Sequence, residues 1–200
     1  MVQQPYHKYV FDLENRTFVG HFEEMYANEE KENYDSWFQE DLSHLGKQIS
    51  LLVLKQFNFK NILDIGCGKG AFTHLLKRES NSVAGVDVSS TAIAKAKMKY
   101  RDIDFRVMNV REALTAPQQW DLIVMMEILS YLKDWKSIIA AAAKKSSVLY
   151  MSLYLPPNPI GFVKSFEELR EEIQKYFFIQ TEILWNQETV FLLAKSNPNV

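Results

Sequence analysis

The stretch that decides the fold is Asn61-Ile-Leu-Asp64-Ile-Gly66-Cys67-Gly68-Lys69-Gly70. Its first half is short and apolar, which is typical of a buried strand, and its three glycines at alternate positions favour a tight turn. Residues 71–77 then continue with a helical pattern. The stretch therefore predicts a strand, a glycine turn and a helix, which together form one unit of a parallel α/β sheet.

The same alternation continues along the chain. Further strands are predicted over 82–88, 103–109, 120–126 and 147–155, with helices over 91–100 and 133–144. A helix over 165–176 follows a proline-rich loop, and the strands 178–184 and 189–195 then flank a polar turn, so they must pair antiparallel. We therefore predict an α/β fold with a Rossmann-like, doubly wound sheet of seven strands, mostly parallel with an antiparallel C-terminal hairpin strand, plus N-terminal helices.

The length of 200 residues favours a single domain. Between residues 18 and 57 the apolar residues recur at helical spacing, which predicts two helices. We expect residues 1–57 to form an N-terminal helical lid or extension, and residues 58–196 to form the Rossmann-like core.

The bulk composition narrows the class of protein. A net charge of −2 and a pI near 6.1 make a nucleic-acid partner improbable. Cys67 is the single cysteine, so an internal disulfide is excluded and a reducing compartment is favoured. Apolar stretches stay far below about 18 residues, so we expect no membrane partner and a cytoplasmic location. The four histidines have no ligand spacing, and no metal is expected.

Two acids flank the glycine turn. Asp64 lies two positions before the first glycine, and Asp87 closes the next predicted strand. An acid at such a strand end can accept hydrogen bonds from both ribose hydroxyls of a nucleoside. Because Asp64 would repel a pyrophosphate, the pair suits S-adenosylmethionine, which carries cations and no phosphate, better than NAD. The glycines also satisfy the looser GxGxxG/A pattern, so an NAD-binding oxidoreductase stays an alternative, as does a purely structural turn.

Three segments carry a resemblance to a known family. Leu63 to Gly70, Gly85-Val-Asp87-Val-Ser89 and Trp120-Asp121-Leu-Ile resemble the motifs of the class I S-adenosylmethionine-dependent methyltransferases. The resemblance covers residues 18–195 and implies methyl transfer to an N or O atom of a small polar molecule. Residues 127–132 are similar to the nodulation-type amino-sugar N-methyltransferases, which adds a sugar or amino sugar as an acceptor class.

The resemblance also assigns cofactor-binding residues. It implies that the glycine turn lines the methionine side, the end of the second strand the ribose, the end of the third strand the adenine, and the end of the fourth strand the transferred methyl. These residues are Asp64, Gly66, Cys67, Gly68 and Gly70, then Asp87 and Val88, then Asn109 and Val110, and then Met126. For Asn109 a capping role at the strand end is an equal alternative.

Aromatic residues of the N-terminal segment are further candidates. Tyr26 and Trp37, together with Tyr34, could cover the cofactor and face its cation. Packing within the lid is the alternative for all three.

Methyl transfer from a sulfonium is an in-line displacement, so the protein must mainly align the donor with the acceptor and exclude water. A hydroxyl or protonated amine acceptor must also lose a proton, and the candidates for removing it are Glu127, Tyr131 and His21. The family more often has a histidine where Tyr131 stands. Glu127 has an equal alternative, which is to solvate the start of a helix.

Two other functions remain on the same fold. A nucleic-acid methyltransferase of the amino-methylating type would place a [DN]PP[YFW] tetrad after the fourth strand, where this chain has Met125-Met-Glu-Ile128. The second alternative function is a catalytically silent binding module that retains the fold. The sequence leaves amine, hydroxyl and carboxylate acceptors open.

Overall fold

The core of the protein is a seven-stranded sheet, seen in a computed structural model that describes residues 4–198. The strands lie in the order β5-β4-β3-β6-β7-β9-β8. Their bounds are β3 Asn61–Ile65, β4 Ser82–Asp87, β5 Asp104–Val107, β6 Trp120–Met126, β7 Ser146–Tyr154, β8 Phe177–Trp185 and β9 Thr189–Ser196. The first five in this order are parallel, and β9 runs antiparallel to both of its neighbours. The predicted Rossmann-like sheet with an antiparallel C-terminal strand is confirmed.

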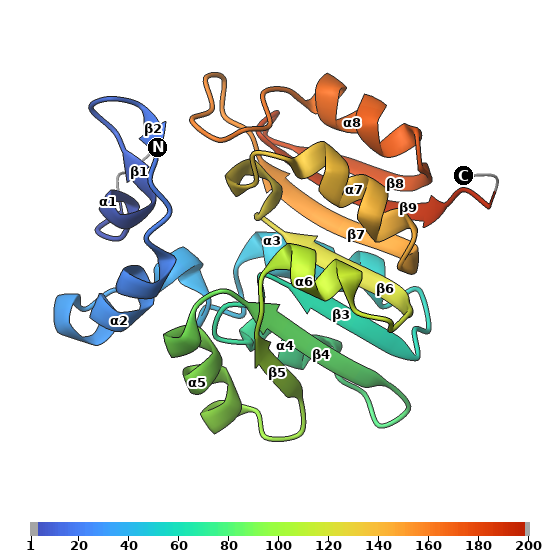
Figure 1. Cartoon of the computed structure of the whole chain (residues 1–200), viewed down its shortest axis with the longest axis horizontal. Coiled ribbons are helices and arrows are strands. Elements are labelled where there is room, and N and C mark those ends of the chain that lie inside the picture. The colour runs from blue at the N-terminus through green and yellow to red at the C-terminus, as the bar shows by residue number, and fades with distance from the viewer. Residues whose placement is uncertain (1–3, 199–200) are drawn as a thin grey trace.

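Helices cover both faces of this sheet (Figure 1). Helices α3 (Leu45–Leu54), α4 (Ala71–Leu76) and α5 (Ser90–Lys99) lie on one face, and α6 (Val110–Thr115), α7 (Trp135–Ala143) and α8 (Phe166–Gln174) lie on the other. The change of face occurs after β5, because the chain then returns across the sheet to β6 and right-handed crossovers require it. The strand ends beside β3 therefore form the switch point at which such folds bind ligands.

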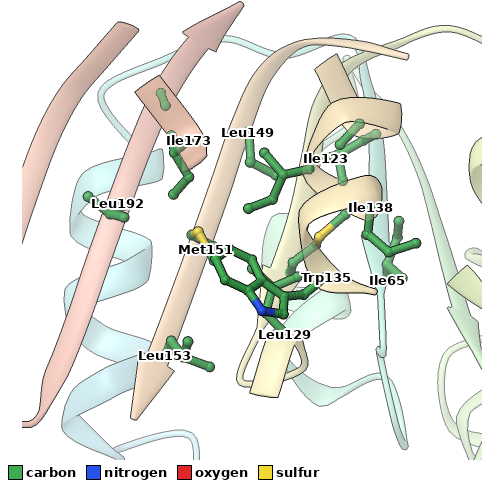
Figure 2. Close-up of a cluster of buried hydrophobic side chains, with 14 of the residues drawn as sticks. Ile65, Ile123, Leu129, Trp135, Ile138, Leu149, Met151, Leu153, Ile173 and Leu192 are labelled. Atoms are coloured by element: carbon green, nitrogen blue, oxygen red, sulfur yellow. The ribbon is translucent and has the colours of Figure 1, made fainter. Parts of the chain in front are cut away.

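Side chains of the buried strands alternate between the two faces of the sheet and pack into a hydrophobic layer on each face. Leu63 and Ile65 of β3 pack toward α7, whereas Ile62 packs toward α3 and α4. Figure 2 shows the larger cluster, in which Trp135 and Ile138 of α7 and Ile173 of α8 lie against the strands. Because side chains alternate between two faces and helices bury both faces, these strands are apolar at nearly every position. Such continuous apolar runs can be recognised in the sequence.

The N-terminal segment lies beyond the carboxyl ends of the parallel strands (Figure 1). It consists of α1 (His7–Val10), the hairpin β1 (Phe11–Asp12) and β2 (Thr17–Phe18), α2 (Phe22–Glu32) and the single turn η1 (Ser36–Phe38). Helix α3 instead packs on the sheet through Leu51 and Leu54. The segment that covers the strand ends is therefore residues 6–44, and we call it the cover segment.

Several short elements were not predicted from the sequence. Helix α1 has four residues, and the hairpin β1–β2 has only two residues in each strand, so neither gave a periodic signal. Helix α6 begins directly after Asn109, and the predicted third strand ends earlier, at Val107. The turn η2 (Leu129–Tyr131) follows β6. Apolar periodicity alone does not reveal elements of this length.

Candidate active site

The candidate site lies where β3, β4 and β6 end. The glycine turn after β3 is held to β4, because the N–H groups of Gly66 and Cys67 both donate to the Val86 carbonyl, at 2.8 and 3.0 Å. The Cys67 side chain points away from this edge into a small apolar cluster with Ile93 and Phe105. Burial raises the pKa of its thiol, so it stays protonated.

The structure gives its own reason for the glycines. All three have positive φ, and an added Cβ at Gly68 would lie 2.3 Å from the Gln39 amide. A Cβ at Gly66 would meet Ile128, and one at Gly70 would meet the ring of Phe105. Side chains of the chain itself therefore pack against all three glycines, and the lack of a Cβ at these positions permits this close packing.

Asp64 is a buried acid under the turn. Its Oδ2 accepts the hydroxyl of Thr73, on α4, at 2.6 Å. Burial raises the pKa of Asp64 to about 7, the Thr73 bond opposes this rise, and the nearby charge of Asp87 adds to it. Within residues 4–198 the other oxygen of Asp64, Oδ1, accepts no hydrogen bond, so this acid can respond to a cation brought beside it.

Asp87 links the turn to the start of α5. Its two oxygens accept the N–H groups of Gly68 and Ser89, each at 2.9 Å. Burial raises its pKa, while these backbone bonds lower it. A carboxylate has about four acceptor positions, so Asp87 retains capacity for a hydroxyl donor beside these backbone N–H groups. The two carboxyl groups at this edge fit a nucleoside that carries a cationic tail and no phosphate.

The residues predicted for the adenine side lie on neighbouring loops. Val88 follows Asp87 with a side chain that is 54% exposed. Asn109 is the N-cap of α6, since its Oδ1 accepts the N–H groups of Arg111 and Glu112. In return, the backbone N–H of Asn109 donates to the Glu112 carboxylate. This is the capping role that the sequence left open. Val110 is the first residue of that helix.

Glu127 follows Met126 directly after β6. Its φ of 59° lies in the left-handed region, which is strained for a residue with a Cβ. Its oxygens accept the hydroxyl of Ser152 at 2.8 Å and the N–H of Tyr154 at 2.6 Å. Burial raises the pKa of Glu127, whereas these two bonds lower it. A strained acid near the end of a central strand is typical of a functional position.

Tyr131 lies among aromatic rings of the cover segment. The ring of Phe18 stacks on it at 5.5 Å, and those of Phe22 and Trp37 lie at 5.4 and 5.9 Å. Burial raises its pKa far above the usual range, and the charge of Glu127 adds to the effect. The structure thus brings Glu127, Tyr131 and Trp37 to one region, with Tyr131 in its neutral form.

The remaining cover residues differ in their positions. Tyr26 is buried, and its hydroxyl accepts the Gln39 amide at 2.7 Å, beside the glycine turn. Tyr34 donates to the Met25 carbonyl at 2.6 Å, which is packing within the segment. His21 is not brought to Glu127 or Tyr131: its imidazole is 58% exposed and lies 3.7 Å from Glu24 of the same helix.

Several residues of the site were not predicted from the sequence. Gln39 contacts the turn, Thr73 holds Asp64, and Ser152 holds Glu127. Thr73 lies nine positions after Asp64, on the first turn of the helix that follows the glycine turn, and this nearness in the chain was the one signal for it. The other two lie far from their partners in the chain, so no local signal pointed to them.

Residues 4–198 lack two classes of feature, a metal-binding cluster and a membrane-spanning helix. No group of three or more His, Cys, Asp or Glu side chains there is arranged to hold a metal ion. No helix in that range combines the length and apolar character needed to cross a membrane.

Comparison with known proteins identifies a family whose model matches most of the chain. A family model described as a methyltransferase domain matches residues 34–181. The chain is 32% identical over 90 residues to a ubiquinone biosynthesis O-methyltransferase of Klebsiella pneumoniae, and 35% identical over 105 residues to nodulation protein S of Sinorhizobium fredii. These matches cover 42% and 51% of this chain and 37% and 48% of those proteins, so the chain matches less than half the length of each relative.

A solved structure shares the architecture. The N-methyltransferase NodS of Bradyrhizobium japonicum WM9, in complex with S-adenosyl-L-homocysteine, superposes with a TM-score of 0.69 at 20% identity. The match covers 86% of this chain and 97% of that one. At this level of identity the likeness establishes a common fold.

Proposed function

This chain belongs to the methyltransferase domain family, of the class I S-adenosylmethionine-dependent type, and from that premise we propose that it methylates an N or O atom of a small polar acceptor. The observation that carries the proposal is the pair of buried acids, Asp64 and Asp87, at neighbouring strand ends around one glycine turn. A pyrophosphate beside two carboxyls would be repelled, which disfavours an NAD-binding oxidoreductase.

The chain's residues would hold the cofactor through complementary charge. S-adenosylmethionine supplies an electrophilic methyl group on a sulfonium. Asp64 would face the ammonium of its amino-acid end, and Asp87 would accept the ribose hydroxyls. Val88 and Val110 would border the adenine, beside the Asn109 cap. The cover segment would exclude water from the reacting atoms.

Glu127 is our candidate for the residue that removes the acceptor's proton. Its raised pKa brings the carboxyl closer to neutral pH, where a base is most effective. Tyr131 is neutral and buried, so it would orient the acceptor rather than act as a base. The exposure of His21 gives it the weakest support of the three.

We further propose that the acceptor is a sugar or an amino sugar. The support is the likeness to nodulation protein S, together with the similarity of residues 127–132 noted above. The likeness to a ubiquinone biosynthesis O-methyltransferase makes a hydroxyl acceptor the second candidate. A nucleic-acid acceptor has less support, because the net charge is −2 and the tetrad of amino-methylating DNA enzymes is missing after β6.

Calorimetry followed by a transfer assay tests this function. We expect S-adenosyl-L-homocysteine to bind in the micromolar range and NAD not to bind. Transfer of a labelled methyl group is then measured against amino sugars, neutral sugars, catechols, bulk tRNA and DNA. Failure to bind S-adenosyl-L-homocysteine contradicts the proposal, and robust labelling of tRNA or DNA contradicts the small acceptor. Tight binding with no transfer to any acceptor would favour a silent binding module.

A further inference from the structure

Gln39 of the cover segment lies directly on the glycine turn. Its Oε1 accepts the backbone N–H of Lys69 at 2.6 Å, and its Nε2 donates to the Tyr26 hydroxyl at 2.7 Å. The same amide fills the space where a Cβ of Gly68 would be. Gln39 thus joins α2, 13 positions before it, to the glycine turn, 30 positions after it.

The loop that presents Gln39 is strained and firmly held. Trp37 and Phe38, immediately before it, have φ values of 58° and 51°, in the region that residues with a Cβ rarely adopt. The ammonium of Lys47, from α3, donates to the carbonyls of Phe38, Gln39 and Asp41. Strain that surrounding contacts maintain often marks a position with a function.

The side chain of Lys69 makes a second link to the cover segment. Its ammonium is 3.0 Å from a Glu29 oxygen and 2.7 Å from an Asp35 oxygen, and the side chains of Lys69 and Glu29 are at least 92% buried. Glu29 also accepts the ammonium of Lys95, on α5, at 2.9 Å. Lys69 is therefore held to the cover segment by both its backbone and its side chain.

We propose that Gln39 is a positioning residue of the cofactor site, which docks the cover segment on the glycine turn so that the closed cover and the binding shape of the turn form together. The proposal rests on the proposed function only for its link to the cofactor. The docking itself is a property of the free protein. Loss of the Gln39 amide would leave a buried N–H of Lys69 without its acceptor and would loosen the turn.

The first test measures docking without any cofactor. Hydrogen exchange of the Lys69 amide is followed by NMR in the full chain, in Gln39→Leu, and in Gln56→Leu as a control. The Gln56 amide donates to the Leu52 carbonyl on an exposed part of α3. We expect exchange at Lys69 to be about tenfold faster in Gln39→Leu, and unchanged in the control. Unchanged exchange in Gln39→Leu overturns the docking.

The second test links docking to the cofactor. We expect S-adenosyl-L-homocysteine to bind about tenfold more weakly to Gln39→Leu, as measured by calorimetry. Gln39→Glu keeps an acceptor oxygen for Lys69, so it should restore slow exchange and an affinity within about threefold of the parent. Faster exchange with unchanged affinity overturns the positioning role. If the parent protein itself binds no S-adenosyl-L-homocysteine, the proposed function fails, while the exchange result still decides the docking.

A double-mutant cycle keeps the inference testable if Gln39→Leu folds poorly. Gly68→Ala is measured in the parent and in Gln39→Ala, where the colliding amide is gone. We expect the loss of affinity caused by Gly68→Ala to be about threefold smaller in the Gln39→Ala background. Equal losses in both backgrounds contradict the contact.

Discussion

The hydroxyl of Thr73 donates to the buried carboxyl of Asp64 at 2.6 Å, and this is the sole hydrogen bond between side chains that Asp64 makes in the described part of the chain. With burial raising the pKa of Asp64 to about 7, and with Asp87 as the neighbouring charge, Asp64 ionises in the physiological range. Cofactor binding and proton release at this acid should therefore be coupled.

Affinity for S-adenosyl-L-homocysteine should rise with pH through the Asp64 ionisation. If the carboxylate is the binding form, a pKa of about 7 predicts a roughly eightfold gain between pH 6 and pH 7.5. Calorimetry in two buffers of different ionisation enthalpy should detect the released proton at pH 6. Asp64→Asn should bind weakly and lose this dependence. An unchanged pH profile in Asp64→Asn would assign the effect to another group.

The same acid should affect stability in the opposite direction. Because the pKa of Asp64 is raised in the folded protein, its protonated form favours folding, and the free energy of unfolding should fall as pH rises from about 4 through about 7. Urea unfolding at pH 5 and pH 7.5 checks this. The decrease should be smaller in Asp64→Asn than in the parent protein.

Asp87→Asn should weaken cofactor binding more than any change at an exposed acid. The N–H groups of Gly68 and Ser89 donate to different oxygens of Asp87, and in the amide one of these oxygens is replaced by an NH2 donor, so one of the two N–H groups loses its acceptor. We expect a loss of about 10- to 100-fold in affinity for S-adenosyl-L-homocysteine, and a similar loss for adenosine, which shares the ribose. Adenosine binding equal to that of the parent would argue against a ribose role.

Glu127→Gln should lower turnover without weakening cofactor binding. The amide is close in shape to the carboxyl, but it cannot take a proton, so we expect the turnover of the acceptor found in the transfer assay to fall by about 10²-fold or more. Glu182→Gln, on β8 and paired with Arg170, is the matched control. Full activity in Glu127→Gln would leave Glu127 with a structural role at the end of β6.

Glu23→Gln should loosen the cover segment. Burial raises the pKa of Glu23, but hydrogen bonds from Ser89, Thr91 and Ser90 at the start of α5 lower it by more than burial raises it. The net result is a pKa of about 2. We expect faster deuterium uptake across α2 in this variant, measured by mass spectrometry. Glu30→Gln, whose side chain is 91% exposed on the same helix, should not change the uptake. Equal uptake in both variants would show that the α5 contact does not hold α2.

Ile139→Ala should destabilise the core between α7 and the sheet. Ile139 is fully buried, so its truncation should cost about 2–5 kcal/mol of unfolding free energy in urea titration. Leu52→Ala, with 67% exposure on α3, should change it by less than about 0.5 kcal/mol.

The sequence predicted what depends on local patterns. Each strand from β3 to β9 was predicted. The buried strands are short apolar runs beside turn residues, whereas the largely exposed edge strand β8 was predicted from the polar turn that joins it to β9. The cap at Asn109 also had a local signal, since Glu112 lies three positions later, yet helix α6 was overlooked. Helix α4 is equally short and was predicted, because the glycine turn before it marked its start, whereas α6 has no such turn.

Long-range contacts were beyond such patterns. The Gln39 contact with Lys69 depends on how the strained loop after α2 folds over the turn, and no local spacing encodes that path. The exposure of His21 also depends on long-range packing. The sequence around a residue at the start of a helix does not show whether its side chain faces the strand ends or the solvent.

The position of β9 between β7 and β8 also bears on how the protein is made. Residues 189–196 supply the hydrogen-bonding partner for one whole side of β7, yet they leave the ribosome after every other strand. Until then one edge of β7 lacks its partner strand, so the sheet can be completed only after β9 has been synthesised, and the edge of β7 is open to pairing with other chains in the meantime.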